Sequence, residues 1–192
     1  MPRVPIDEAM EVAFQHHQAG RAAEAEGILR QILIDQPTHE GAWHHLGKLF
    51  MDTGQTDEAV AALGEAVRLN PHFIEAHYDL GIALMNLQRP EEAIGAWQRV
   101  TQLQPDHAEA YGQMARALRV VGRVDEAIEA IAACTRAIES QSIRARGYRA
   151  RSFTSTGSVC TTSPSAEGLI SKIRENSADR SANASEFFGG SI

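Results

Sequence analysis

The sequence predicts an all-α fold, a solenoid of four helix-turn-helix repeats followed by a mostly disordered C-terminal tail. Two observations support the repeats. Pro37, Pro71 and Pro105 lie 34 residues apart, and similar residues recur at equal places between them. Within each unit, apolar residues follow helical i, i+3, i+4, i+7 spacing. A third observation indicates the tail: the repeat pattern stops after Gln141.

The repeat boundaries follow when each proline is taken as position 32 of a unit. The repeat domain then covers residues 6–139, and the units are 6–39, 40–73, 74–107 and 108–141. Two positions hold small residues throughout: position 8 (Ala13, Gly47, Gly81, Ala115) and position 20 (Ala25, Ala59, Ala93, Ala127). Small side chains let the two helices of a unit approach closely, and a larger residue there is expected to overpack the contact.

Two helices are expected in each unit. In the second repeat, Trp43, Leu46, Gly47 and Phe50 stand at the apolar spacing of the first helix. Glycine at position 15 (Gly20, Gly54, Gly122) can supply the left-handed residue that ends it, and the third repeat has Gln88 instead. Pairs of acidic residues suit the positive N-terminal end of the second helix. The second helix is expected to end before the proline at position 32, because proline disfavours helical geometry at the residue before it. Four aromatic residues are expected on buried faces: Trp43, Phe50, Trp97 and Tyr111.

The stretches "WHHLGKLF", "AVAAL" and "P", from Trp43 to Pro71, resemble the tetratricopeptide repeat signature. The resemblance covers about residues 6–139, and the fourth unit departs from it with Glu139 in place of proline. It implies a right-handed superhelix whose first helices line a concave groove.

Composition narrows the possible partners. The formal net charge is −7, which argues against nucleic acid because phosphate binding needs clustered Lys and Arg. No run of 18 apolar residues is present, and the start "MPRVPIDEAMEV" has no apolar stretch. We therefore expect no membrane association and a cytoplasmic location.

No catalytic or metal motif is found. The sequence has no P-loop, G-x-S-x-G or G-x-G-x-x-G, so we expect no enzyme activity and no cofactor. The adjacent pairs His16-His17 and His44-His45 point about 100° apart on a helix, so neither pair easily chelates one metal. We interpret the histidines as surface and groove residues.

The candidate binding site is the groove face of the first helices, at positions opposite the apolar spacing. It comprises Met10, Phe14, His17, His44, Lys48, Met51, Tyr78, Ile82, Met85, Glu109, Arg116 and Arg119. Several of these are apolar where a solvated face would be charged, and Met and Tyr are common at binding surfaces. Arg116 and Arg119 suit a carboxylate or phosphate. An ordinary mixed surface is the alternative interpretation.

The C-terminal end raises a separate question. Residues 142–192 are Ser-rich and of low complexity, and "EGLISKIREN", residues 167–176, is a candidate for a short helix. A terminal repeat needs a cap, yet none follows at once. Three explanations are open. The candidate helix 167–176 could fold back as the cap, or two copies could form a homodimer through the uncapped repeat. Alternatively, the chain could be a fragment of a longer protein.

We therefore expect a scaffold that binds a protein or peptide in the concave groove. The alternative comes from a second resemblance. Residues 16–47 resemble the first repeats of bacterial proteins related to O-linked N-acetylglucosamine transferases. This resemblance implies a non-catalytic, substrate-presenting arm of such an enzyme, truncated before its catalytic domain.

Overall fold

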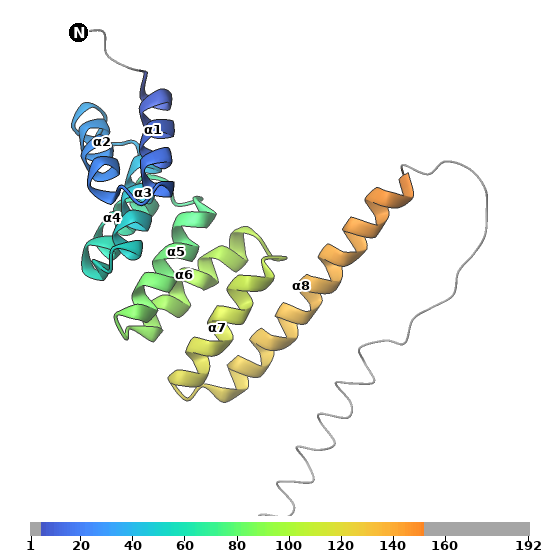
Figure 1. The fold of residues 1–192 in the computed structure, drawn as a ribbon. Helices are drawn as coiled ribbons and strands as arrows, with labels where there is room; N and C mark the ends of the chain where they lie inside the picture. Colours follow the sequence, from blue (N-terminus) through green and yellow to red (C-terminus); the bar gives the residue numbers. More distant parts are fainter. Residues whose placement is uncertain (1–4, 152–192) are drawn as a thin grey trace, which may run out of the picture. The chain divides into compact units, whose positions relative to one another are not determined.

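The computed structural model describes the backbone of residues 5–151 and the side chains of residues 5–144. This part of the chain forms eight α-helices and no strand (Figure 1). The helices are α1 (Ile6–Gln18), α2 (Ala22–Asp35), α3 (Glu40–Asp52), α4 (Thr56–Leu69), α5 (Ile74–Asn86), α6 (Pro90–Leu103), α7 (Ala108–Val120) and α8 (Val124–Arg151).

The helix starts recur every 34 residues. The first helices begin at residues 6, 40, 74 and 108, the first positions of the four predicted units. The second helices begin at residues 22, 56, 90 and 124, which is position 17 in each unit. Each helix packs against the next one along the chain, so the units form an all-α solenoid.

The turn between the two helices of each unit depends on one left-handed residue. Gly20, Gly54 and Gly122 have φ of 73°, 78° and 78°, and Gln88 adopts φ 58° in the third unit. The glycine prediction is therefore confirmed in three units. Gln88 takes the same conformation without the freedom of glycine, which places an L-residue in a disfavoured region.

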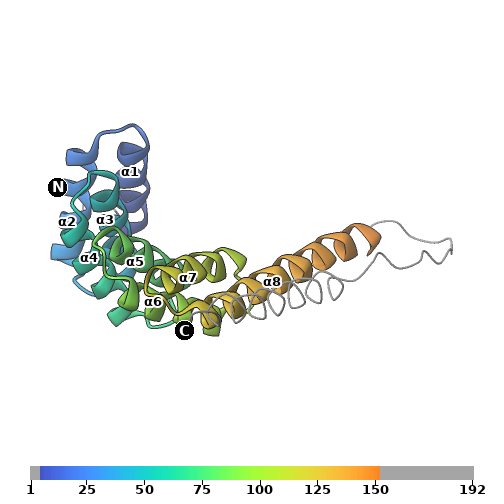
Figure 2. The ribbon, with the colours of Figure 1, turned by 90° about the horizontal axis from the view of Figure 1, so that it is seen from below.

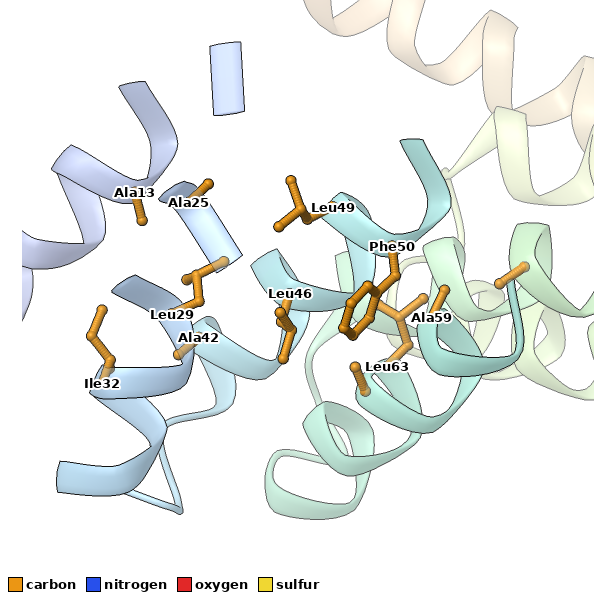
Figure 3. Close-up of a cluster of buried hydrophobic side chains, with 12 residues drawn as sticks. Ala13, Ala25, Leu29, Ile32, Ala42, Leu46, Leu49, Phe50, Ala59 and Leu63 are labelled. Atoms are coloured by element: carbon orange, nitrogen blue, oxygen red, sulfur yellow. The ribbon is translucent and has the colours of Figure 1, made fainter. Parts of the chain in front are cut away.

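Close packing within the units explains the small residues of the first helices. A Cβ atom on Gly47 would lie 2.6 Å from Cγ of Leu63, a distance that leaves no room for alanine. Figure 3 shows Leu46, Leu49 and Phe50 of α3 among Leu29 and Ile32 of α2 and Leu63 of α4, and all of these belong to one buried cluster. A second cluster continues through α5, α6, α7 and α8.

The last helix is longer than the repeat pattern predicts. Because Glu139 replaces the proline, nothing in the sequence stops α8, and it runs to Arg151 instead of ending near residue 139. Its later part is held by Asp106: Gln141 Nε2 donates to the Asp106 carbonyl oxygen at 2.7 Å, and Arg144 forms an ion pair with the Asp106 carboxylate. The predicted tail boundary at residue 142 therefore falls inside a helix. The candidate helix 167–176 lies outside the described residues.

A search of the described helices for a membrane-crossing segment found none of sufficient length and apolar character.

Candidate functional site

The candidate site is the surface that α1, α3, α5 and α7 present together, which we call the first-helix face. Figure 2 shows these four helices on the inner side of the curve that the helix pairs follow. Contacts of α3 with both α1 and α5 bring residues of successive units together on this face. Side chains from different repeats can therefore act on one bound segment.

Two histidine–aspartate pairs cross from one unit to the next on this face. His17 Nε2 of α1 lies 2.8 Å from Asp52 Oδ2 of α3, and His44 Nε2 of α3 lies 2.8 Å from Asp79 Oδ2 of α5. Both partners are 35 residues apart in the sequence. The sequence analysis placed the two histidines on the face but did not identify either aspartate, because their approach depends on how adjacent units stack.

His44 is less available than the sequence analysis expected. The residue is only 7% exposed, and its ring lies 4.8 Å from that of Phe73, centroid to centroid. With Nε2 held by Asp79, the side chain contributes to the contact between units. Among the twelve predicted groove residues, His44 is the one that the structure buries.

His45, the neighbour of His44, stands in a crowded basic environment. Its pKa is lowered below the ordinary value of 6.5, first by burial and then by repulsion from His44, Lys48, His17 and His39. The neutral imidazole is therefore favoured there.

Apolar side chains contribute to the first-helix face in the first three units. Phe14 is exposed and its ring meets that of His45 edge-on, with centroids 6.0 Å apart. The remaining apolar candidates are half-buried, with one side packed on the core: Met10, Met51, Tyr78, Ile82 and Met85. The face therefore offers apolar surface without breaking its own packing.

Two arginines lie at the fourth unit. Met85, Arg116, Arg119 and Val120 line a hollow of about 290 Å³ between α5 and α7. Arg116 Nη1 donates to Gln113 Oε1 at 2.9 Å, but within residues 5–144 neither arginine forms an ion pair with a carboxylate. Both guanidinium groups are exposed and can receive an anion beside an apolar wall. Lys48 and Glu109 are also exposed on their helices.

Two further histidines support this face as helix caps. The Ala42 amide donates to His39 Nδ1 at 3.0 Å, and the Ala110 amide donates to His107 Nδ1 at 3.2 Å. The His107 ring also lies 5.2 Å from the Tyr78 ring, which holds Tyr78 beside the next unit. The sequence analysis missed these roles, because histidine is not among the residues that usually cap the start of a helix.

The aromatic residues divide between the core and the outer side. Phe50 and Trp97 are buried as expected, at 5% and 1% exposure. Trp43 and Tyr111 were also expected on buried faces, but they are only half-buried, and Trp43 packs against the edge of the first core cluster. The Trp43 Nε1 donates to the Pro37 carbonyl oxygen at 2.9 Å.

The outer side has a hollow of its own, of about 610 Å³. It lies between α2, α3 and α4, and its lining residues include Leu33, Ile34, Trp43 and Phe50. It holds none of the twelve predicted groove residues.

Within the described residues, no group of three or more His, Cys, Asp or Glu side chains has the geometry to hold a metal ion.

Comparison with known proteins gives a family and a fold. One tetratricopeptide repeat model matches residues 44–108 and again 78–142, and a second one matches residues 16–67. No curated protein matches the chain.

Solved structures of MamA are similar to this chain. One crystal structure of MamA is 21% identical with a TM-score of 0.68, covering 71% of this chain and 80% of that one. A MamA structure from MSR-1 is 22% identical (TM-score 0.63, 72% and 79%), and one from AMB-1 is 24% identical (TM-score 0.64, 70% and 74%). Likeness at this level of identity shows the shared solenoid fold.

Proposed function

This chain belongs to the tetratricopeptide repeat family, and from that premise we propose that it is a protein-interaction scaffold that binds a peptide segment of a protein partner. The binding surface is the first-helix face. The scaffold acts without catalysing a reaction and without a cofactor.

The hollow at the fourth unit is the observation that supports this proposal most directly. Arg116 and Arg119 place two exposed cations beside the apolar side chains of Met85 and Val120. A planar guanidinium pairs with a carboxylate through two hydrogen bonds, and an apolar wall excludes water from that contact. The hollow therefore suits an acidic residue that stands next to an apolar one.

The rest of the face suits the continuation of the same segment. Tyr78, Ile82 and Met85 offer half-buried apolar surface toward the hollow, and Phe14 offers more at the first unit. Such surfaces bind apolar side chains that recur along an extended or helical peptide. The proposed ligand is therefore a peptide with several apolar residues and a carboxylate at one end of the contact.

The test starts from a displayed library of random peptides selected on the full chain. We expect the selected peptides to combine Asp or Glu with apolar residues. Fluorescence anisotropy of one labelled peptide then measures affinity for the Tyr78→Ala/Arg116→Ala double variant. We expect a weakening of at least about tenfold, which corresponds to 1.4 kcal/mol.

Arg30→Ala provides the matched control, since Arg30 is an exposed arginine on α2, away from the first-helix face. This variant should bind the peptide as the wild type does. Full binding by the double variant, or selected peptides without acidic residues, would contradict the proposal.

Substrate presentation for a glycosyltransferase is a second candidate function, supported by the resemblance of residues 16–47. It would use the same face, with an acceptor protein as the bound partner. Glycosyl transfer by the purified chain would refute the non-catalytic role in either case. Association of two copies is a separate proposal, supported by exposed apolar residues of α8.

A further inference from the structure

One position of the first-helix face alternates in chemistry from unit to unit. Position 9 holds Phe14, Lys48, Ile82 and Arg116, which follow one another every 34 residues. Position 8 is buried in all four units, whereas position 9 is exposed in three of them and half-buried at Ile82. This row therefore presents apolar, basic, apolar and basic side chains in order along α1, α3, α5 and α7.

The two cations of the row form no ion pair in the described part of the chain. Asp52 stands one helical turn after Lys48 on α3, but its Oδ2 lies 2.8 Å from His17 Nε2 instead. Arg116 Nη1 donates to the Gln113 side-chain oxygen at 2.9 Å, which leaves its charge without a carboxylate. Both cations are therefore available to an anion from a ligand.

The distance between the two cations sets the spacing of the groups that they can bind together. α3 contacts α5, and Met85 of α5 lines one hollow with Arg116 of α7, so the three first helices are successive neighbours. Neighbouring helices lie about 10 Å apart, so two steps along the row span about 20 Å. An extended chain rises about 3.3 Å per residue, so about six residues bridge Lys48 and Arg116.

Ile82 stands between the two cations and selects against charge at the middle of the row. Its side chain is half-buried against the second core cluster. An acidic residue placed over it would lose hydration without gaining a partner. An apolar residue placed there would bury apolar surface instead. The row therefore suits two separated acidic residues better than a uniformly acidic segment.

We propose that the first-helix face recognises two acidic residues about six apart in an extended partner segment, with an apolar residue midway between them. Arg116 binds one carboxylate, Lys48 binds the other, and Ile82 contacts the apolar residue. A further apolar residue beyond Lys48 meets Phe14. This inference rests on the proposed peptide binding and extends it, because that proposal requires only the acidic residue at Arg116.

Labelled peptides of equal length and composition test the spacing by fluorescence anisotropy on the full chain. Each peptide carries one acidic residue beside an apolar one, and a second acidic residue roughly three, six or nine residues away. Every peptide and its reversed sequence are measured, since the row fits either chain direction. We expect the tightest binding at a separation of about six residues. An affinity that does not depend on the separation would overturn the proposal.

Lys48→Glu tests the second anchor. This variant should weaken the best two-acid peptide by about fivefold to tenfold, because a repulsion replaces an attraction at an exposed site. It should not weaken a peptide whose second acidic residue is replaced by serine. Arg30→Glu is the matched control: it reverses an exposed charge on α2, away from the first-helix face, and should bind both peptides as the wild type does. An equal loss of both peptides with Lys48→Glu would overturn the role of Lys48.

Ile82→Lys tests the middle of the row by a gain of binding. Wild type should prefer an apolar residue at the midpoint of the peptide, and the variant should prefer Asp there. A lysine stem can keep the apolar packing of Ile82 while its ammonium group reaches the surface. A thermal melt shows whether the variant is folded. A folded variant that keeps the wild-type preference would overturn the assignment of Ile82, and Lys48→Glu remains the test if the variant does not fold.

Failure of this inference can be distinguished from failure of the proposed function. If Arg116→Ala weakens peptides with a single acidic residue while Lys48→Glu affects no peptide, peptide binding stands and the two-anchor pattern is refuted. If no acidic peptide binds the chain, both proposals are refuted.

Discussion

The backbone of Gly81 in α5 lies directly against the indole ring of Trp97 in α6. A Cβ atom on Gly81 would stand 2.5 Å from Cε2 and Nε1 of that ring. Trp97 is 1% exposed, and its Nε1 donates to the Tyr78 carbonyl oxygen at 3.2 Å, so the ring has little freedom to move. The same relationship holds between Gly47 and Leu63 in the second unit.

Gly81→Ala should therefore destabilise the domain by about 1–3 kcal/mol, because the added methyl group overpacks the contact. Urea unfolding followed by circular dichroism measures the change. Gly95→Ala is the matched control: Gly95 is also helical, and nothing lies within 4 Å of its would-be Cβ. That substitution should stabilise the domain by about 0.5–1 kcal/mol. Equal effects at the two sites would contradict the close contact at Trp97.

Truncating the two tryptophans should have unequal effects. Trp97→Ala removes a buried ring and should destabilise by about 3–5 kcal/mol. Trp43→Ala should cost clearly less, because Trp43 is half-exposed and its Nε1 bonds only to the Pro37 carbonyl oxygen on the surface. Thermal melts of both variants decide the order. A larger loss for Trp43→Ala would show that the outer side of α3 is more deeply packed than described.

The turn of the third unit offers a stabilising substitution. Gln88 adopts φ 58°, where the equivalent residues of the other units are glycines. Gln88→Gly should raise the free energy of unfolding by about 1 kcal/mol, since it removes the steric penalty of a left-handed L-residue. Gly54→Ala, at φ 78° with nothing within 4 Å of its would-be Cβ, should lower it by a similar amount. No gain in melting temperature for Gln88→Gly would contradict the turn geometry.

The fold follows closely from the sequence because its determinants are local. A proline recurs in the first three units, a turn residue and two small positions recur in all four, and together they predict two helices in each unit. The end of α8 was not predicted. The fourth unit lacks its proline, and the hydrogen bond from Gln141 to the Asp106 carbonyl oxygen joins residues 35 apart in the sequence.

The candidate site was predicted less well than the fold. Helical spacing locates the residues of the first-helix face, but it does not show what each one contacts in the next unit. His44 is buried by Asp79 and Phe73, and both contacts depend on the stacking of units. The hydrogen bond from Trp43 to the Pro37 carbonyl oxygen likewise joins a side chain to the preceding unit, which helical spacing alone does not show.

Stability should rise with pH across the titration of His45. Its pKa in the folded chain is lowered below 6.5, mainly by burial, so the unfolded chain binds more protons as the pH falls below 6.5. Stability is therefore lost on acidification until the pH falls below the folded pKa. His45→Gln removes this contribution and should flatten the pH dependence of the melting temperature. An unchanged slope below pH 6.5 would contradict the burial of the imidazole.

The two histidine–aspartate pairs differ in burial, and their removal should differ accordingly. The His44–Asp79 side chains are 9% and 17% exposed, whereas those of His17–Asp52 are 22% and 67% exposed. Asp79→Ala leaves the buried Nε2 of His44 without its partner, which should destabilise by about 1–3 kcal/mol. Asp52→Ala breaks a contact of the same length at an exposed carboxylate.

Asp52→Ala should therefore cost no more than about 1 kcal/mol, since water can replace the lost oxygen. Urea unfolding of both variants at one pH makes the comparison direct. The two substitutions remove the same group at the same sequence separation, so a difference between them reports burial. Equal losses would mean that α3 and α5 do not close over His44, and His44 would then be available to a bound peptide.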